Sequence, residues 1–123
     1  MHGRTALAVL IATLAMTPPA FASCVTYHFR FFSRGDAVTT SESMSSGDTC
    51  FHTLRNNPLK GSVFQSVAVV QTPGHGAVTA SGSGFQYRSS PGYRGSDSYA
   101  VKICMQSPRG QGCSTVTFNA DIN

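Results

Sequence analysis

Gly74–Ile103 reads GHGAVTASGSGFQYRSSPGYRGSDSYAVKI, and this stretch decides the fold that the sequence predicts. It consists of short alternating segments that are separated by residues typical of turns. Two strands, Ala77–Ala80 and Phe85–Arg88, are expected on either side of a turn at Ser81–Gly84. The second strand carries its two aromatic residues two positions apart, so both point to one face of a sheet.

Two more turns and a core strand follow. Ser90-Pro91-Gly92 predicts a turn, because proline presets φ at its second position and glycine accepts a positive φ at the third. Gly95-Ser96-Asp97 predicts another turn, in which the Asp97 side chain bonds neighbouring backbone N–H groups. Tyr99, Val101 and Ile103 then alternate, which is typical of a core strand.

Three elements of this region follow the pattern of a known family. They are Pro73-Gly74-His75-Gly76, Phe85-Gln86-Tyr87 and Pro91-Gly92-Tyr93-Arg94-Gly95-Ser96-Asp97-Ser98-Tyr99. Residues 62–122 thereby resemble the bacterial immunoglobulin-like (cadherin-like) domains of secreted and cell-surface proteins. The resemblance implies an all-β, Ig-like antiparallel sandwich of about seven strands. It also implies that His75 shapes a turn, but it does not identify a ligand.

The N-terminus has the features of a secretory signal peptide over Met1–Ala22. His2 and Arg4 form a basic start, and Ala6–Met16 is an uncharged apolar run. Ala20-Phe21-Ala22 supplies the small residues of a cleavage site. The apolar run is shorter than the ~20 residues of a membrane span, so we expect export without a span.

Cleavage leaves residues 23–123 as a single domain in a secreted or periplasmic location. Cys24 allows a second interpretation, in which it is the lipid-bearing first residue of a lipoprotein. The formal net charge of +4 falls to +3 with the loss of Arg4, and the remaining basic residues are scattered. Because nucleic-acid binding needs a basic patch with interleaved aromatic residues, no nucleic-acid partner is expected.

The rest of the chain is expected to add strands and loops but no helix of normal length. Strands are predicted at Cys24–Phe32, at Thr49–Leu54, at Ser62–Gln71 and around Val116–Ile122, with a short edge strand at Val38–Glu42. Arg34-Gly35-Asp36 has the sequence of an integrin-binding loop, but we interpret it as a turn.

The cysteines are even in number, which predicts a disulfide framework with three possible connectivities. They are Cys24, Cys50, Cys104 and Cys113. Pairing Tyr99 with Phe118 matches the core faces of the last two strands. The same register places Cys104 opposite Cys113, within disulfide reach and on the face away from the core. Cys24–Cys50 then follows by elimination.

Residues that could carry catalysis or bind a metal are scattered. The carboxylates are Asp36, Glu42, Asp48, Asp97 and Asp121, and the histidines beyond the signal peptide are His28, His52 and His75. No serine lies in a G-x-S-x-G elbow, and no C-x-x-C motif occurs. Cys50-Phe51-His52 offers two metal ligands without a second pair. We therefore expect no catalytic residue, metal or cofactor.

Two classes of function follow. The first is a non-enzymatic binding or structural module for a protein or glycan partner at the bacterial cell envelope. The alternative is a small secreted hydrolase or metal-binding protein on the same scaffold. The first is favoured because the motifs of the second are missing. Tyr93, Arg94 and Arg109 mark the expected contact surface, since tyrosine and arginine dominate binding hot spots; the alternative for Tyr93 is that it caps the core.

Overall fold

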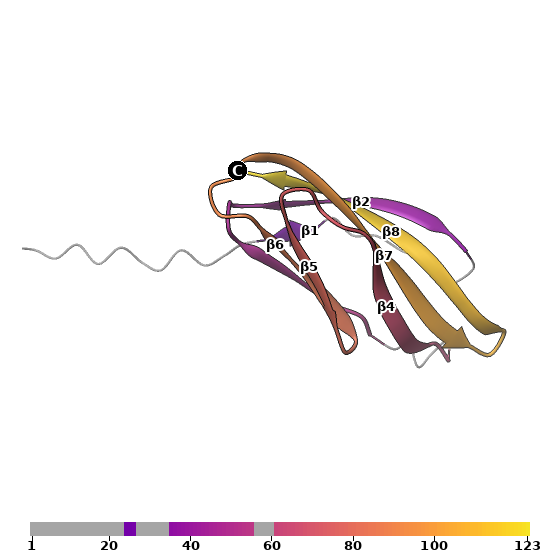
Figure 1. Cartoon of the computed structure of the whole chain (residues 1–123). Helices are drawn as coiled ribbons and strands as arrows, with labels where there is room; N and C mark the ends of the chain where they lie inside the picture. Colours follow the sequence, from indigo (N-terminus) through magenta and orange to yellow (C-terminus); the bar gives the residue numbers. More distant parts are fainter. Residues whose placement is uncertain (1–23, 27–34, 56–60) are drawn as a thin grey trace, which may run out of the picture.

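The computed structural model describes residues 24–26, 35–55 and 61–123, and these residues form strands and no helix. The strands are β1 (Val25–Thr26), β2 (Ala37–Met44), β3 (Thr49–Thr53), β4 (Val63–Gln71), β5 (Gly76–Ser81), β6 (Gly84–Ser89), β7 (Gly95–Ser107) and β8 (Gly110–Ile122). One sheet has the order β1-β2-β8-β7-β4 and the other β3-β6-β5 (Figure 1). The expected all-β class is confirmed. The signal peptide Met1–Ala22 lies outside the described residues, as does most of the strand expected at Cys24–Phe32.

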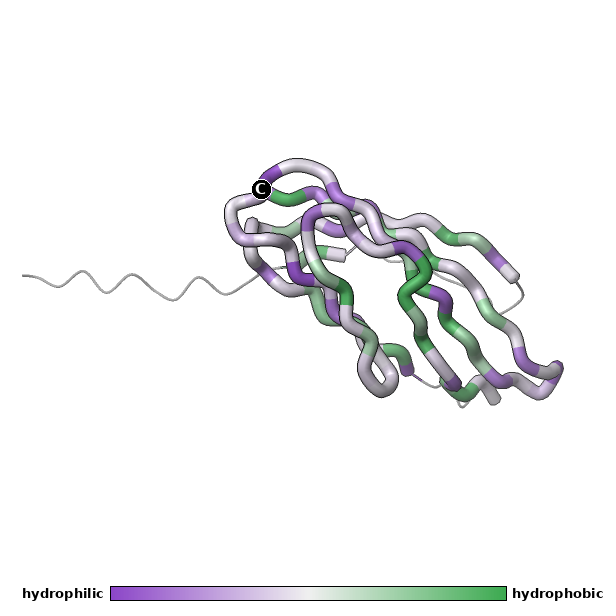
Figure 2. The backbone as a smooth tube through the Cα atoms, in the orientation of Figure 1, coloured by the Kyte–Doolittle hydropathy of each residue, from purple (hydrophilic) through white to green (hydrophobic). Residues whose placement is uncertain are grey.

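The two sheets face each other, and aromatic rings from both meet between them. Tyr87 of β6 stacks on Tyr99 of β7 with ring centroids 4.7 Å apart. Phe85 of β6 meets Phe118 of β8 edge-on at 5.5 Å. Figure 2 shows apolar and polar residues alternating along the strands, because successive side chains point to opposite faces of a sheet. The core therefore comes from one face of each sheet.

The β7–β8 hairpin has the register that the sequence predicts. Tyr99 lies opposite Phe118, and Cys104 lies opposite Cys113. The alternating apolar residues of both strands are buried on the inner face, as expected. Both strands have 13 residues, so this hairpin is the longest paired unit among the described residues.

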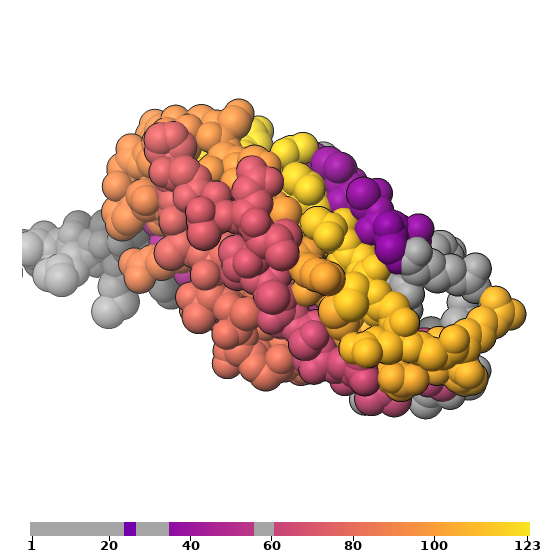
Figure 3. Space-filling model, turned by 45° about the vertical axis from the view of Figure 1, so that its right-hand side comes forward, coloured from indigo at the N-terminus to yellow at the C-terminus, as the bar shows by residue number. Residues whose placement is uncertain are grey.

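The strand expected at Val38–Glu42 differs from the prediction in length and position. It is the eight-residue β2, and it lies between β1 and β8 rather than at an edge. β2 also runs parallel to β8, whereas an antiparallel fold was expected; Figure 3 shows the two side by side. The prediction was wrong because two inward positions, Thr40 and Glu42, are polar and give the strand the composition of an exposed edge.

The two turns after β6 have different outcomes. The predicted turn at Ser90-Pro91-Gly92 is confirmed, since the N–H of Tyr93 donates to the Ser90 carbonyl at 3.1 Å and Gly92 has φ +86°. The turn expected at Gly95-Ser96-Asp97 is wrong, because these residues begin β7 and pair with residues 120–122 of β8. The Asp97 side chain does bond backbone N–H groups, but two of them belong to the β4–β5 connection.

The remaining strand predictions agree with the structure. β3 and β4 occupy the segments expected at Thr49–Leu54 and Ser62–Gln71, and β5 and β6 form the predicted hairpin. Of Arg34-Gly35-Asp36, the arginine lies outside the described residues. Gly35 has φ +85° and donates its N–H to the Cys113 carbonyl, which agrees with a turn.

Both disulfides join the cysteines that the sequence pairs. Cys24–Cys50 has a Cα–Cα distance of 5.4 Å and links the segment before β1 to β3, hence one sheet to the other. Cys104–Cys113 has a Cα–Cα distance of 4.0 Å and lies within the β7–β8 hairpin. In the part of the chain that the structure describes, no helix is long and apolar enough to span a membrane.

Candidate functional site

A buried carboxylate, Glu42 on β2, is the centre of a polar cluster between the sheets. The Glu42 side chain has no exposed surface, and its two oxygens have different partners. The Tyr99 hydroxyl donates to Oε1 at 2.7 Å, and His52 Nε2 lies 3.0 Å from Oε2. Such partners are needed because an isolated carboxylate is very costly to remove from water. Glu42 is therefore a partnered core residue and not a surface acid.

The three members of this cluster come from three strands in two sheets. Glu42 points inward because it alternates with Thr40 and Met44, which are also buried. β7 supplies Tyr99 from the same sheet, and β3 supplies His52 from the opposite sheet. The Glu42–His52 contact consequently joins one sheet to the other through polar atoms.

Aromatic packing fixes the ring of His52 in this cluster. The ring stacks on Phe85 with centroids 4.7 Å apart and lies tilted against Phe118 at 4.9 Å. Tyr99 stacks on Phe118 in turn, at 5.0 Å. The His52 side chain is 11% exposed, so its Nε2 edge has little freedom to turn away from Glu42.

A second carboxylate, Asp97, is also buried and lies near the start of β7. It accepts a hydrogen bond of 2.6 Å from the Tyr87 hydroxyl. It also accepts the backbone N–H groups of Gly74, His75 and Ser98 at 2.9 Å, 3.0 Å and 2.9 Å. Four donors around one carboxylate fasten the β4–β5 connection to the start of β7.

These environments shift the pKa values of three groups. Burial raises the pKa of Tyr99, and the charge and hydrogen bond of Glu42 raise it further. Burial likewise raises the pKa of Tyr87, together with its hydrogen bond to Asp97. Burial alone would raise the pKa of Asp97, but the bonds from Tyr87 and the backbone N–H groups outweigh it and lower that pKa below its usual value. Both tyrosines are therefore held as neutral donors.

The polar cluster is directed inward throughout. Among the described residues, no buried side-chain nitrogen or oxygen is left without a hydrogen-bond partner. A general acid or base must come within about 3 Å of the group it serves. With no exposed surface, Glu42 offers no such approach in this conformation.

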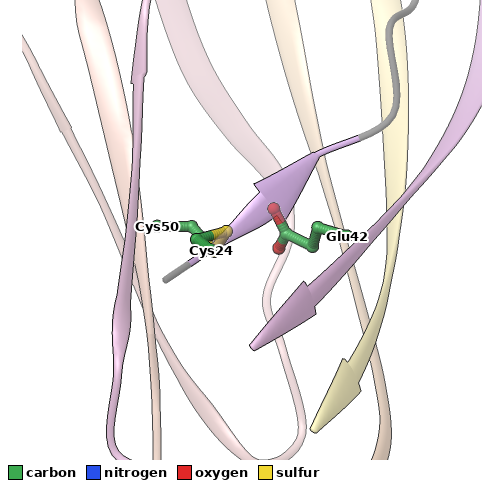
Figure 4. A group of neighbouring side chains, drawn as sticks. All are labelled: Cys24, Glu42 and Cys50. Carbon is green, nitrogen blue, oxygen red and sulfur yellow. A yellow bond between two sulfur atoms is a disulfide. The ribbon is translucent and has the colours of Figure 1, made fainter. Parts of the chain in front are cut away.

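The Cys24–Cys50 disulfide lies directly against this cluster. Both sulfur atoms and a carboxylate oxygen of Glu42 lie within 4.8 Å of one another, and Figure 4 shows the carboxylate directed at the disulfide. The histidines do not converge with them as a set. His52 contacts Glu42, His75 stacks on Tyr93 with centroids 3.8 Å apart, and His28 lies outside the described residues.

The structure separates the residues of the expected contact surface. Tyr93 is half-buried, packs against the core and donates its hydroxyl to the Ser96 carbonyl at 2.7 Å, as the capping interpretation expects. Arg94 directly precedes β7 and Arg109 lies two residues after its end, so the 13-residue strand stands between them. At ~3.3 Å per residue that strand spans roughly 40 Å, and the two exposed arginines cannot belong to one small patch.

β4 forms one edge of the five-stranded sheet, and β1 forms the other. Among the described strands, only β7 is hydrogen-bonded to β4, and β5 of the opposite sheet lies near its other side. The sequence of β4, VFQSVAVVQ, contains no charge and no proline. Val63 and Val70 are 50% and 53% exposed, which is unusual for valine. Two bulges, at 64–66 and 69–71, leave residues 66–69 as its regular section.

Two depressions lie on the surface of the described part of the chain. One, of about 760 Å³, is lined by hydroxyl, amide and carboxylate groups that include Ser43, Asn119 and Asp121, and the buried Glu42 and Asp97 are also among its lining residues. It has no aromatic side chain, although ligand pockets are usually lined by apolar and aromatic groups. The other, of about 420 Å³, includes Phe51, which is 74% exposed, and Gln86.

No protein-family model matches the chain, and no curated protein matches it in sequence.

Sequence reasoning missed the role of both buried carboxylates. Glu42 and Asp97 were grouped with the scattered acids, although each lies in an alternating segment beside residues that proved to be buried. The usable signal was the period of two: Glu42 shares its parity with Met44, and Asp97 shares its parity with Tyr99. Their partners come from strands that the sequence alone does not bring together.

Proposed function

We propose that this chain is an exported, non-catalytic Ig-like domain that binds a protein partner at the bacterial cell envelope or outside the cell. The observation that carries the proposal is the β4 edge, which is uncharged, lacks proline and exposes two valines. Edge strands of soluble proteins are normally protected by charges, proline or cover, because they otherwise pair with other chains. The β4 edge has two bulges but neither charge nor proline, and its regular section at 66–69 suits a partner that adds a strand to the sheet.

The order of the strands supports the Ig-like part of the proposal. In Ig domains, strands two, four and five lie in one sheet, and strands three, six and seven lie in the other. If β2 is counted as the first strand, strands two, four and five are β3, β5 and β6, which form one sheet here. Strands three, six and seven are then β4, β7 and β8, which lie together in the other sheet. Together with the resemblance of residues 62–122, this grouping favours the Ig-like class over other two-sheet folds.

Export is supported by the signal-peptide features of Met1–Ala22 and by the disulfides, which persist in oxidising compartments. The disulfide also bears on the lipoprotein interpretation. A lipoprotein carries its lipid on the sulfur of its first cysteine, and the Cys24 sulfur is bonded to Cys50. We therefore favour a free secreted or periplasmic domain over one anchored at Cys24.

Binding is favoured over hydrolysis because the carboxylate–histidine pair of this chain is enclosed. Glu42 and His52 contact each other between the sheets, and Asp97 is satisfied by four internal donors. A protein partner is favoured over a glycan because the larger depression has no aromatic lining. The Phe51 depression is the place where a glycan would have to stack, and it provides the competing outcome of the test.

Site-specific photo-crosslinking in cells of the native host tests the proposal. A photoreactive amino acid is placed at Ala68, in the regular section of β4, and for comparison at Phe51, Arg94 or Arg109. We expect a protein adduct from Ala68, and we expect Ser66→Lys to reduce it while Gln111→Lys, which adds the same charge at the start of β8, does not. Adducts from Arg94 or Arg109 alone would move the interface there. The protein partner would be rejected if no position gave a protein adduct and if the chain bound to a glycan column in a way that Phe51→Ala abolishes.

A further inference from the structure

Two sulfur atoms and a carboxylate meet at one point between the sheets. Cys24 Sγ, Cys50 Sγ and an oxygen of Glu42 lie within 4.8 Å of one another, and Figure 4 shows all three side chains directed to this point. Cys50 and Glu42 are fully or almost fully buried, and Cys24 is partly buried. Thiolates and carboxylates are metal ligands, but the disulfide occupies both sulfur atoms in this state.

We propose that reduction of the Cys24–Cys50 disulfide converts this cluster into a Zn²⁺ site with Cys24, Cys50 and Glu42 as ligands. A dithiol reductant supplies two electrons and two protons to the S–S bond and is itself oxidised to a disulfide. Zn²⁺ then displaces the two thiol protons and binds two thiolates and the Glu42 carboxylate. The disulfide and the metal are thus alternative links between β3 and the opposite sheet.

The ligand types select the metal. Two thiolates favour Zn²⁺ and other thiophilic ions, whereas Ca²⁺ and Mg²⁺ require oxygen ligands. Three negative ligands in a buried site are strongly unfavourable without a cation, and a divalent ion offsets most of that charge. Metal binding of this kind is coupled to release of the thiol protons, so it weakens as the pH falls.

The geometry needs only local adjustment. In a tetrahedral site with Zn–S bonds of about 2.3 Å, the two sulfur atoms stand about 3.8 Å apart and each lies about 3.5 Å from the carboxylate oxygen. The Glu42 oxygen must therefore approach each sulfur atom by ~1.3 Å at most, and the sulfur atoms must separate. Cys24 can supply this movement, because β1 pairs with β2 through Val25 and Thr26 alone among the described residues.

Glu42 is already held as a metal ligand would be. Tyr99 donates to Oε1 at 2.7 Å, and His52 Nε2 contacts Oε2 at 3.0 Å. Outer hydrogen bonds of this kind orient ligands, and their loss typically costs 10- to 100-fold in metal affinity. Tyr99 and His52 are thus positioning residues.

Metal titration of the purified mature protein tests the site. The chain is reduced with a phosphine, which adds no thiol ligand, and titrated with Co²⁺ followed by Zn²⁺. We expect one Co²⁺ per chain, with thiolate-to-cobalt absorption that Zn²⁺ abolishes. The oxidised chain should show none. The melting temperature of the reduced chain should rise with Zn²⁺, because a ligand that binds only the folded state stabilises it.

Matched variants separate this site from the other cysteine pair. Cys24→Ser should abolish the absorption in the reduced chain, whereas Cys104→Ser should leave it unchanged. Glu42→Gln and His52→Gln should each weaken Co²⁺ binding at least ~10-fold. Equal binding by Cys24→Ser and the unchanged chain would overturn the proposal, as would the absence of Co²⁺ binding by reduced chain that circular dichroism shows to be folded. If reduction unfolds the chain and neither metal restores its spectrum, the proposal is also wrong.

Discussion

The Tyr99 hydroxyl donates a 2.7 Å hydrogen bond to Oε1 of Glu42, although the two residues are 57 positions apart in the sequence. The bond passes over β8, which separates β2 from β7 in the sheet. It therefore ties together two strands that do not pair with each other. Because His52 contacts the other oxygen of Glu42 from the opposite sheet, one carboxylate connects three strands.

Removing the Tyr99 hydroxyl should measure the value of this connection. Tyr99→Phe keeps the ring against Tyr87 and Phe118 but leaves Glu42 one donor short. We expect a loss of about 1.5–3 kcal/mol in the free energy of unfolding, as for hydrogen bonds to charged groups. Urea unfolding measures it. The control is Tyr93→Phe, whose hydroxyl bond to the Ser96 carbonyl is solvent-exposed and should cost no more than about 1 kcal/mol. Equal losses of unfolding free energy in the two variants would contradict a larger contribution from the bond to Glu42.

Asp97 should make stability depend on acid pH. Its pKa is lowered from 3.8 in the folded chain, so its contribution is present above pH 3.8 and is lost as the pH falls below that value. Asp97→Asn replaces one acceptor oxygen by an NH₂ group that faces other donors. We expect a loss of about 2–4 kcal/mol at neutral pH.

The pH profile of that variant distinguishes the charge from simple packing. The difference in unfolding free energy between the original chain and Asp97→Asn should shrink on acidification from neutral pH to about pH 3. Urea unfolding at several pH values measures this difference. A difference that stays constant over the range would contradict the assignment of a lowered pKa to Asp97.

The two core tyrosines should make the chain sensitive to alkali. The folded-state pKa values of Tyr87 and Tyr99 are raised above 10.0, so both stay protonated where the unfolded chain would lose protons. Their contribution is complete below pH 10.0 and is lost as the pH rises above it, with a slope of about 1.4 kcal/mol per pH unit for each tyrosine. In an alkaline titration, the phenolate absorbance of these two tyrosines should therefore increase together with the fraction of unfolded chain. Tyr87→Phe and Tyr99→Phe should each remove one tyrosine from this absorbance change.

The sequence predicted the parts of the fold in which apolar alternation is unbroken. In the β7–β8 hairpin the apolar residues of both strands have the same period, so matching Tyr99 with Phe118 set the register and placed Cys104 opposite Cys113. The β5–β6 hairpin and the turn before Tyr93 were predicted from glycine and proline chemistry. These features depend on residues that are close in sequence, or on a register with two independent markers.

The buried polar cluster could not be predicted in the same way. A glutamate in a serine- and threonine-rich segment has the composition of an exposed strand, and only its partners make it a core residue. Those partners, Tyr99 and His52, reach Glu42 because β2 runs parallel to β8 and because the two sheets face each other. The same arrangement explains why β2 was wrongly assigned to an edge. Asp97 was assigned to a turn because its side chain was expected to accept hydrogen bonds from neighbouring residues. Two of its donors are instead the N–H groups of Gly74 and His75.

The two disulfides should differ in their contribution to stability, because they close loops of different length. The chain segments enclosed have sequence separations of 26 for Cys24–Cys50 and 9 for Cys104–Cys113. The loop-entropy model then gives about 3.5 and about 2.6 kcal/mol. Cys104–Cys113 also joins residues that already face each other in a paired hairpin, whereas Cys24–Cys50 links the two sheets. We therefore expect Cys24→Ala/Cys50→Ala to unfold at a lower urea concentration than Cys104→Ala/Cys113→Ala. Its free energy of unfolding should be lower by about 1 kcal/mol or more.

The comparison uses the purified, oxidised mature chain and its two double variants, with unfolding followed by circular dichroism at equal protein concentration. Cys50 is fully buried beside Glu42, so its replacement by alanine also leaves a small cavity, which adds to the loss for the first variant. Cys24→Ala alone leaves the Cys50 side chain in place and separates the bridge from the cavity. If the Cys104–Cys113 pair proved the more stabilising of the two, loop length and the link between the sheets would not be what sets the contribution of these bridges.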